Sequence, residues 1–259
     1  MSTLCPAPKA GLFLAQVDGK NAWMGFPLRT LAICICCLAV TTAARAQDPC
    51  AEGELISAQV SDKQLRLTWI GTVRDGMAKR IIETFEPLKD RVGAVTLRLH
   101  SCGGDSDAMR RTIEVLRGIR QTHHLSTVVQ LGGTCSSACI PIFLQGERRY
   151  AALTSVWAFH QSSWQDRDRI DRDAVVRRSD MAETDKKLKE YYEPAGVSKR
   201  WLKRLRSHIL FGEWWQTGRD LWEEKSGIIT EVLSNSYPNA GEERQHLSPA
   251  VICGTFCRG

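Results

Sequence analysis

The sequence predicts a single α/β domain at residues 47–233 of the 259-residue chain. Along this region, short stretches of β-forming residues alternate with stretches of helical periodicity, as expected for strands joined by helices. No internal repeat or linker interrupts it between residues 55 and 233. Apolar residues make up 43% of the chain, which is enough to build a core and argues against intrinsic disorder.

The first half of the domain contains strands at 64–73, 95–99 and 125–131 and helices at 74–89 and 106–119. The first strand is rich in β-forming residues, and the helix after it has apolar residues at helical spacing. Val95, Leu97 and Leu99 alternate with polar residues, which is typical of a strand. Asp105 is placed to cap the helix that follows.

The second half contains helices at 136–145, 166–193, 198–210 and 221–225 and strands at 155–159 and 228–233. The helix 136–145 is short and apolar, and Ser198 is placed to cap the helix that it precedes. The helix 166–193 carries charges of both signs, which is typical of a solvated helix face and not of a nucleic-acid contact.

Residues 1–46 predict an export leader. The apolar run TLAICICCLAVTTA has the length of a secretory h-region, and Ala44-Arg45-Ala46 forms a cleavage pattern before Gln47. The tail before this run is long for such a leader, which is consistent with translation starting at Met24. The alternative is an uncleaved leader that anchors the chain in the membrane. We favour cleavage, followed by a periplasmic or secreted protein with no stable membrane span.

Cleavage changes both the charge and the cysteine content. The leader has four basic residues and one acidic residue, so it carries half of the net charge of +6. The remaining excess is too small for a dedicated nucleic-acid binder. Six of the ten cysteines remain: Cys50, Cys102, Cys135, Cys139, Cys253 and Cys257. An even number in an exported protein fits an oxidising compartment. The last two lie in a polar C-terminal tail, residues 234–259.

Three segments suggest nucleophilic catalysis when taken together. Ser101-Cys102-Gly103-Gly104 follows a predicted strand and precedes a helix, where backbone N–H groups can form an oxyanion hole. Gly133–Cys139 lies in a similar place and contains a serine pair that a sharp turn can expose. His160 ends a strand and could serve as general base. Each segment alone is weak evidence for catalysis, and the order of the three segments along the chain strengthens the prediction.

These segments resemble parts of the ClpP/crotonase superfamily. LRLHSCGGDSDAM is similar to its strand, Gly-Gly turn and helix, GTCSSACIPIFLQGERRY to its nucleophile segment, and SVWAFHQ to the segment with its histidine. The similarity covers about residues 60–233 and is greatest to exported ClpP-like proteins related to serine peptidases. It implies a spiral of β-β-α units in one domain and assembly into a homo-oligomer.

The resemblance also implies roles for individual residues. Ser137 matches the nucleophile, with Ser136 as the neighbouring alternative, and His160 matches the general base. Gly104 and Ala138 match the oxyanion-hole donors, and Gly103 shapes the turn between them.

The third member of the family's triad has no direct match. The family's aspartate falls within the region 207–215, which contains no aspartate in this chain. Glu213 is our candidate to orient His160, and His208 is a poorer one. Since a histidine without a carboxylate partner is a weaker base, this departure affects the expected activity more than the expected fold.

The six cysteines predict disulfides and leave several pairings open. We favour Cys135–Cys139, which requires Cys135 to lie in the turn before the helix, because residues four apart in a helix are too far separated. Alternatively, Cys102 could pair with Cys135. Cys50 could pair with Cys253 or Cys257 and join the two termini. A metal site or a cysteine nucleophile at Cys135 or Cys139 is less consistent with this spacing and with export.

Two functions follow from these observations. The first is an exported serine hydrolase, in particular a peptidase that acts on peptides or proteins without a cofactor or metal. The second is a catalytically inactive binding or scaffold protein with the same fold. A crotonase-type enzyme acting on acyl-coenzyme A would use the same oxyanion hole, but export would separate it from the coenzyme. We favour the hydrolase.

Overall fold

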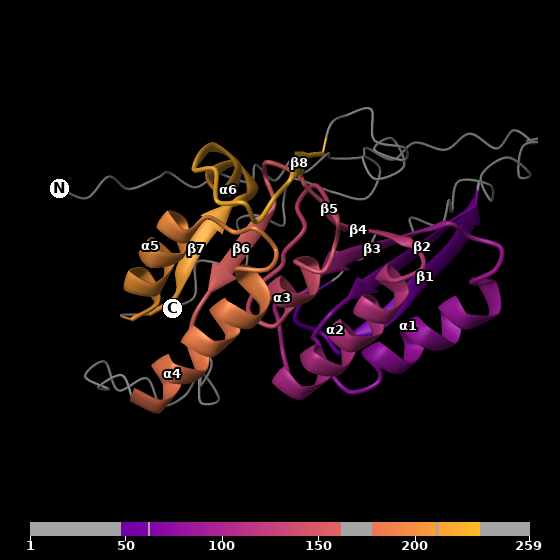
Figure 1. The fold of residues 1–259 in the computed structure, drawn as a ribbon, viewed down its shortest axis with the longest axis horizontal. Coiled ribbons are helices and arrows are strands. Elements are labelled where there is room, and N and C mark those ends of the chain that lie inside the picture. Colours follow the sequence, from indigo (N-terminus) through magenta and orange to yellow (C-terminus); the bar gives the residue numbers. More distant parts are fainter. Residues whose placement is uncertain (1–47, 62, 162–177, 211, 234–259) are drawn as a thin grey trace, which may run out of the picture. The chain divides into compact units, whose positions relative to one another are not determined.

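The computed structural model describes residues 48–61, 63–161, 178–210 and 212–233, all of which belong to one compact unit (Figure 1). The predicted leader, the first part of the predicted helix 166–193, and the tail with Cys253 and Cys257 lie outside the described residues. No helix in the described ranges is long and apolar enough to cross a membrane.

A six-stranded sheet forms the centre of the fold. Its strands, in spatial order, are β1 (Glu54–Ser61), β2 (Gln64–Ile70), β3 (Ala94–His100), β4 (His124–Val129), β5 (Arg148–Ala151) and β8 (Glu231–Val232). β1 is antiparallel to β2, and every other neighbouring pair is parallel. Helices connect the consecutive parallel strands from β2 to β5, as parallel pairing requires. The predicted α/β class is therefore confirmed.

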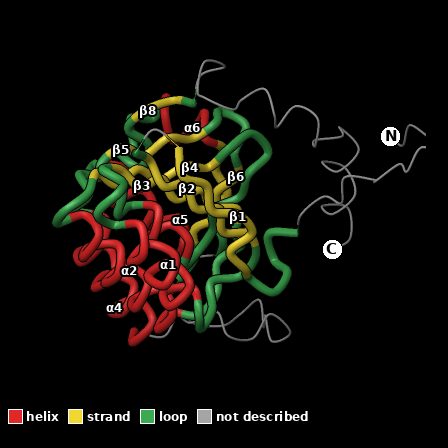
Figure 2. Tube along the Cα trace, turned by 90° about the vertical axis from the view of Figure 1, so that its right-hand side faces the viewer, coloured by secondary structure: helices red, strands yellow, loops and turns green. Residues whose placement is uncertain are grey.

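Helices cover one face of this sheet. Figure 2 shows α1 (Met77–Phe85) and α2 (Ser106–Arg120) side by side on that face, and the two helices are in contact. Burial alternates along β2, where Leu65, Leu67 and Trp69 are fully buried in the core. The apolar side chains of α1 and α2 belong to the same core, which explains the helical spacing found in the sequence.

A second, smaller sheet contains β6 (Val156–Phe159) and β7 (Trp214–Thr217), which are antiparallel. The helices of this half are α3 (Cys139–Phe143), α4 (Arg178–Lys187), a π-helical segment at Leu188–Tyr192, α5 (Lys199–Ile209) and α6 (Gly218–Glu223). Phe159 and Trp214 pack around Trp201 of α5, with ring centroids 5.3 Å from that of Trp201 in both cases. This aromatic contact holds α5 against the small sheet.

Arg149 ties β5 to the C-terminal half of the domain. Its buried guanidinium donates to the carbonyl oxygens of Gly146, Ala195, Gly227 and Ile228 at 2.8–3.1 Å. These four acceptors come from three separate segments of the chain. Burial lowers the pKa of Arg149, and four carbonyl dipoles compensate part of the cost of its desolvation.

The predicted elements occur in the described ranges, with some shifts in their ends. The helix expected at 136–145 is reduced to α3, and the helix expected at 74–89 becomes α1 followed by the short 3₁₀ helix Glu86–Leu88. Asp105 and Ser198 cap α2 and α5 as predicted, accepting the N–H groups of Ala108 and Trp201. Three strands were not predicted: β1, β5 and β7.

Candidate functional site

Three parallel segments bring the predicted site together. Beyond the end of β3, Ser101 bridges Cys135, and Thr134 bridges Val156 at the start of β6. Residues 134–136 therefore run between the end of β3 and β6, parallel to both. The Gly-Gly turn follows on one side and His160 on the other, with Ser137 between them. The carboxyl ends of parallel strands are where α/β sheets commonly place ligand sites.

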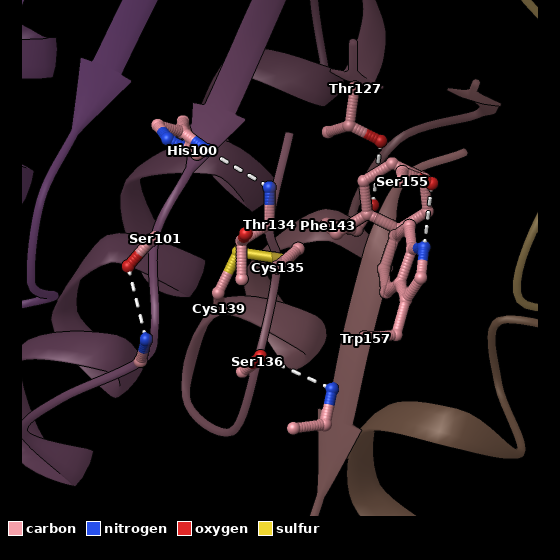
Figure 3. The surroundings of a disulfide bond; sticks show 12 residues. His100, Ser101, Thr127, Thr134, Cys135, Ser136, Cys139, Phe143, Ser155 and Trp157 are labelled. Atoms are coloured by element: carbon pink, nitrogen blue, oxygen red, sulfur yellow. Dashed lines mark hydrogen bonds between the residues drawn. A yellow bond between two sulfur atoms is a disulfide. The ribbon is translucent and has the colours of Figure 1, made fainter. Parts of the chain in front are cut away.

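The two adjacent serines have different environments. Ser136 is buried, and its Oγ accepts a hydrogen bond from the N–H of Ala158 at 3.1 Å (Figure 3). Ser137 is half-buried, and its backbone N–H donates to the carbonyl of Ala158 at 2.9 Å. Within the described part of the chain, the Ser137 hydroxyl has no hydrogen-bond partner. The Ser136 hydroxyl thus contributes to the fold, whereas the Ser137 hydroxyl makes no such bond to the described residues.

Ser137 also has an unusual backbone. Its φ of 52° lies in the left-handed region, which a residue with a side chain seldom occupies. The turn directly precedes α3, so the chain reverses sharply from an extended segment into a helix. Such strain is commonly stored at functional sites.

The Gly-Gly turn lies directly against Ser137. A Cβ on Gly103, whose φ is 98°, would come within 2.6 Å of the Cβ of Ser137 and 3.2 Å of the backbone nitrogen of Ala138. A side chain at position 103 would therefore push these two segments apart. This observation explains the glycine there.

Two backbone N–H groups remain available at this contact. The N–H of Gly103 donates to the Oγ of Ser101, and Val73 bonds to residues on both sides of Gly104, so the N–H of Gly104 points away from Val73. Among the described residues, neither Gly104 nor Ala138 donates its N–H to a partner. A pair of free N–H groups beside a hydroxyl can stabilise an oxyanion.

His160 directly follows β6, two residues after Ala158, whose carbonyl accepts the N–H of Ser137. Its Nδ1 is hydrogen-bonded to the carbonyl oxygen of Gln161. Because a carbonyl oxygen only accepts, Nδ1 must carry the proton, which leaves Nε2 as the basic nitrogen. The Gln161 side chain is held in turn by the Ile209 carbonyl at 2.8 Å.

Neither candidate for the third position contacts His160 in the described part of the chain. The pairing of Phe159 with Trp214 places Glu213 opposite His160 in the next position of the register. The Glu213 carboxylate, however, accepts from the indole N–H of Trp215 at 2.9 Å. His208 is exposed and stacks on Trp214, with ring centroids 4.5 Å apart.

Two disulfides flank the site. Cys135–Cys139 is present, with Cys135 in the extended segment and Cys139 at the first residue of α3 (Figure 3). Cys50 is bonded to Cys102, so the alternatives that paired Cys102 with Cys135, or Cys50 with Cys253 or Cys257, are wrong for this structure. The reason is local: the segment before β1 runs beside the Gly-Gly turn, where Pro49 accepts the N–H of Cys102 at 2.9 Å.

These bonds also bear on the two other readings of the cysteines. Cys135 and Cys139 are completely buried and bonded to each other, so neither has a free thiolate for nucleophilic attack. The described residues contain no group of three metal-ligating side chains.

One positioning residue was missed in the sequence. The Nδ1 of His100 accepts the backbone N–H of Thr134 at 2.9 Å and so helps to hold the segment that leads to Ser137 (Figure 3). Its place immediately before Ser101, at the end of a predicted strand, was the available signal.

No protein-family model and no curated protein matches the chain.

Proposed function

We propose that this chain is an exported serine hydrolase with a ClpP/crotonase-like fold, and that it cleaves peptide bonds. The observation that carries the proposal is the turn at Ser137. There, a strained serine with a free hydroxyl lies beside two backbone N–H groups that have no partner in the described residues. Strain, a free nucleophile and free donors at one point are difficult to explain by stability alone.

The residues of the site divide the chemistry as follows. The Oγ of Ser137 attacks the carbonyl carbon of the scissile bond while the Nε2 of His160 takes the hydroxyl proton. The N–H groups of Gly104 and Ala138 bind the oxyanion that forms. Loss of one such donor in a working enzyme costs about 3–4 kcal/mol of transition-state stabilisation. His160 then protonates the leaving amine, and water hydrolyses the acyl-enzyme.

The Gln161 carbonyl substitutes for the missing aspartate in one respect. It fixes the histidine tautomer that has the proton on Nδ1, which is the orienting part of the carboxylate's role. A neutral oxygen stabilises the imidazolium less than a carboxylate does. Glu213, opposite His160 in the register, is our candidate to supply that charge, since a carboxylate that accepts from Trp215 can accept a second hydrogen bond.

The two disulfides support export, because such bonds form and persist in oxidising compartments. The spiral fold and the homo-oligomer rest on the resemblance of the sequence to the ClpP/crotonase superfamily. The mostly parallel sheet with sequentially ordered strands is compatible with that fold.

The alternative is a binding or scaffold protein that has kept the fold without catalysis. The lack of an aspartate in residues 207–215, where the family has the third residue of its triad, favours this alternative.

A fluorophosphonate probe separates the two functions. We expect the oxidised, folded protein to be labelled on Ser137, with labelling lost in Ser137→Ala and kept at a measurable level in Ser136→Ala. Mass spectrometry of the labelled peptide identifies the serine. Absence of labelling on the folded wild type would reject the hydrolase and leave the scaffold.

A further inference from the structure

Lys187 at the end of α4 is a partly buried cation with an incomplete set of partners. Its Nζ donates to the Oγ of Ser106, the first residue of α2, at 3.0 Å. None of the carboxylates in the described ranges lies within ion-pair distance of this ammonium group. An ammonium has three donors, and a single neutral hydroxyl compensates little of the cost of its burial.

A cavity of about 180 Å³ lies at this contact. Its lining includes Ser106, Met109 and Tyr191 together with three cations, Arg110, Lys186 and Lys187. Two carboxylates, Glu183 and Glu190, also line it, so the cavity has a net positive charge. Ligand pockets for whole small molecules are larger, so this space fits one functional group or side chain.

Two of the three cations that line the cavity, Lys186 and Lys187, form no ion pair with the described residues, and Lys187 is the more buried of the two. Arg110 is paired with Asp107. Burial lowers the pKa of Lys187, Arg110 lowers it further, and Glu183, one turn earlier on α4, acts in the opposite direction. Since Glu183 does not reach ion-pair distance, an incoming anion would provide the missing partner.

The larger cavity nearby, about 390 Å³, is a weaker candidate because its cations already have partners. Arg117 donates to the Gln145 side chain and lies over the ring of Tyr191. Arg120 donates to the Gln145 carbonyl at 3.1 Å.

The position of Ser106 links the smaller cavity to the proposed active site. Ser106 follows Gly104 by two residues, with only the capping residue Asp105 between them. A group bound at Lys187 would therefore lie beside the first residue of the helix that follows the turn proposed to bind the oxyanion. Binding energy from parts of a substrate that lie away from the reacting bond can select among substrates.

We propose that Lys187 and Ser106 form a carboxylate-binding subsite that selects peptides with an acidic side chain near the scissile bond. This assignment of substrate class rests on the proposed hydrolase function, but the binding of the carboxylate itself does not. Lys187 provides the charge, and Ser106 orients the ammonium from the start of α2.

A binding experiment tests the subsite without catalysis. The probes are N-acetyl-glutamate amide and its neutral analogue N-acetyl-glutamine amide, titrated into the full chain in a calorimeter. We expect the acid to bind at least tenfold more tightly than the amide, since a hydrogen bond to a charged group is worth that much. The preference should disappear in Lys187→Met and persist in Lys186→Met, the exposed neighbour. Equal binding of acid and amide to the wild type overturns the proposal, and this comparison needs no variant.

Hydrolysis of matched peptides tests the selectivity. Peptides that differ only by Glu or Gln next to the cleaved bond should differ in kcat/KM by about tenfold or more in the wild type and not in Lys187→Met. Carboxylate binding without any turnover would keep the subsite and reject the hydrolase. Turnover without a preference for Glu would reject the subsite and keep the hydrolase. Loss of turnover of the Gln peptide in a folded Lys187→Met protein would make the lysine catalytic and would also overturn the proposal.

Discussion

At Ser137 the chain adopts a conformation that costs a residue with a side chain about 1–2 kcal/mol relative to an ordinary backbone. Glycine would occupy the same position without this cost, yet the sequence has serine. The adjacent Ser136 has the opposite role, because its buried hydroxyl is an acceptor for the Ala158 backbone. Replacing the serine should therefore change the free energy of unfolding in opposite directions at these two consecutive positions.

We expect Ser137→Gly to raise the free energy of unfolding by about 1 kcal/mol while abolishing fluorophosphonate labelling. Ser136→Ala should lower it by about 1–3 kcal/mol, because the N–H of Ala158 would be buried without a partner. Urea denaturation of both variants measures the two changes. A destabilised Ser137→Gly would show that the serine side chain contributes to folding and would argue against a functional reason for the strain.

Gly103 offers a second test at the same contact. Its positive φ and the predicted clash of a new Cβ with Ser137 mean that Gly103→Ala should destabilise the protein by about 1–3 kcal/mol and weaken labelling. Gly118 in the interior of α2 is the matched control, since a Cβ there meets nothing within 4 Å. Gly118→Ala should instead stabilise by about 0.4–1 kcal/mol. Thermal unfolding and labelling of both variants check the prediction, and equal effects would contradict it.

Local signals explain how far the sequence could locate the site. A recognisable strand precedes each of Ser137, His160 and the paired glycines. Their order along the chain therefore indicated that they lie at the same edge of a sheet. The Cys50–Cys102 pair left no such trace, because it depends on where the segment before β1 runs in space. The hydrogen bond from the Trp215 indole to Glu213 was equally hidden, because it depends on how the side chains of β7 and the residues before it pack in space.

At the scale of elements, the N-terminus of α6 carries a pH-dependent contribution to stability. Thr217 and Asp220 form a capping box in which each side chain accepts the other residue's backbone N–H. Hydrogen bonds from Thr217 hold the pKa of Asp220 below its ordinary value. The ionised form is thus favoured by the fold, and its contribution is lost as the pH falls through the lowered pKa.

We therefore expect Asp220→Asn to be less stable than the wild type at pH 7, with the difference shrinking as the pH falls below about 4. Urea denaturation at pH 7 and pH 3 provides the measurement. If the difference in the free energy of unfolding between the wild type and Asp220→Asn stayed constant over this pH range, the Asp220 charge would not contribute to the cap.

The elements that could be predicted are those whose burial follows a simple period. α2 and α5 have one buried face and one exposed face, β2 alternates between buried and half-buried residues, and their sequences show it. β5 was missed because two of its four residues are arginines, which do not indicate a buried strand. One of them, Arg149, is nevertheless buried, and carbonyl groups accept its hydrogen bonds. β7 alternates between half-buried and exposed residues with tryptophans in both environments, so its hydropathy has no period.

For the whole molecule, the two disulfides constrain the chain over very different lengths. Cys50–Cys102 joins residues 52 apart in sequence, and Cys135–Cys139 joins residues 4 apart. In the chain-entropy model these separations correspond to about 4 and about 2 kcal/mol. The longer bridge stabilises the domain as a whole, whereas the shorter one fixes the turn that contains Ser137.

We expect Cys50→Ser/Cys102→Ser to lower the free energy of unfolding about twice as much as Cys135→Ala/Cys139→Ala. The second variant should nevertheless lose most of its fluorophosphonate labelling, because the turn is no longer closed by a covalent bond. Chemical denaturation without reductant and labelling at a temperature where both variants are folded give the two readouts. Full labelling of the Cys135→Ala/Cys139→Ala variant would show that backbone hydrogen bonds alone hold the turn.

The long bridge also determines how this protein would respond to a protease. Lys89 and Arg91 are exposed in the connection between the first helix and β3, between the two bonded cysteines. A tryptic cut at either residue leaves both fragments linked through sulfur, so they migrate as one band on a gel without reductant and separate only when the bond is reduced. A single band under non-reducing conditions would therefore not demonstrate an intact backbone.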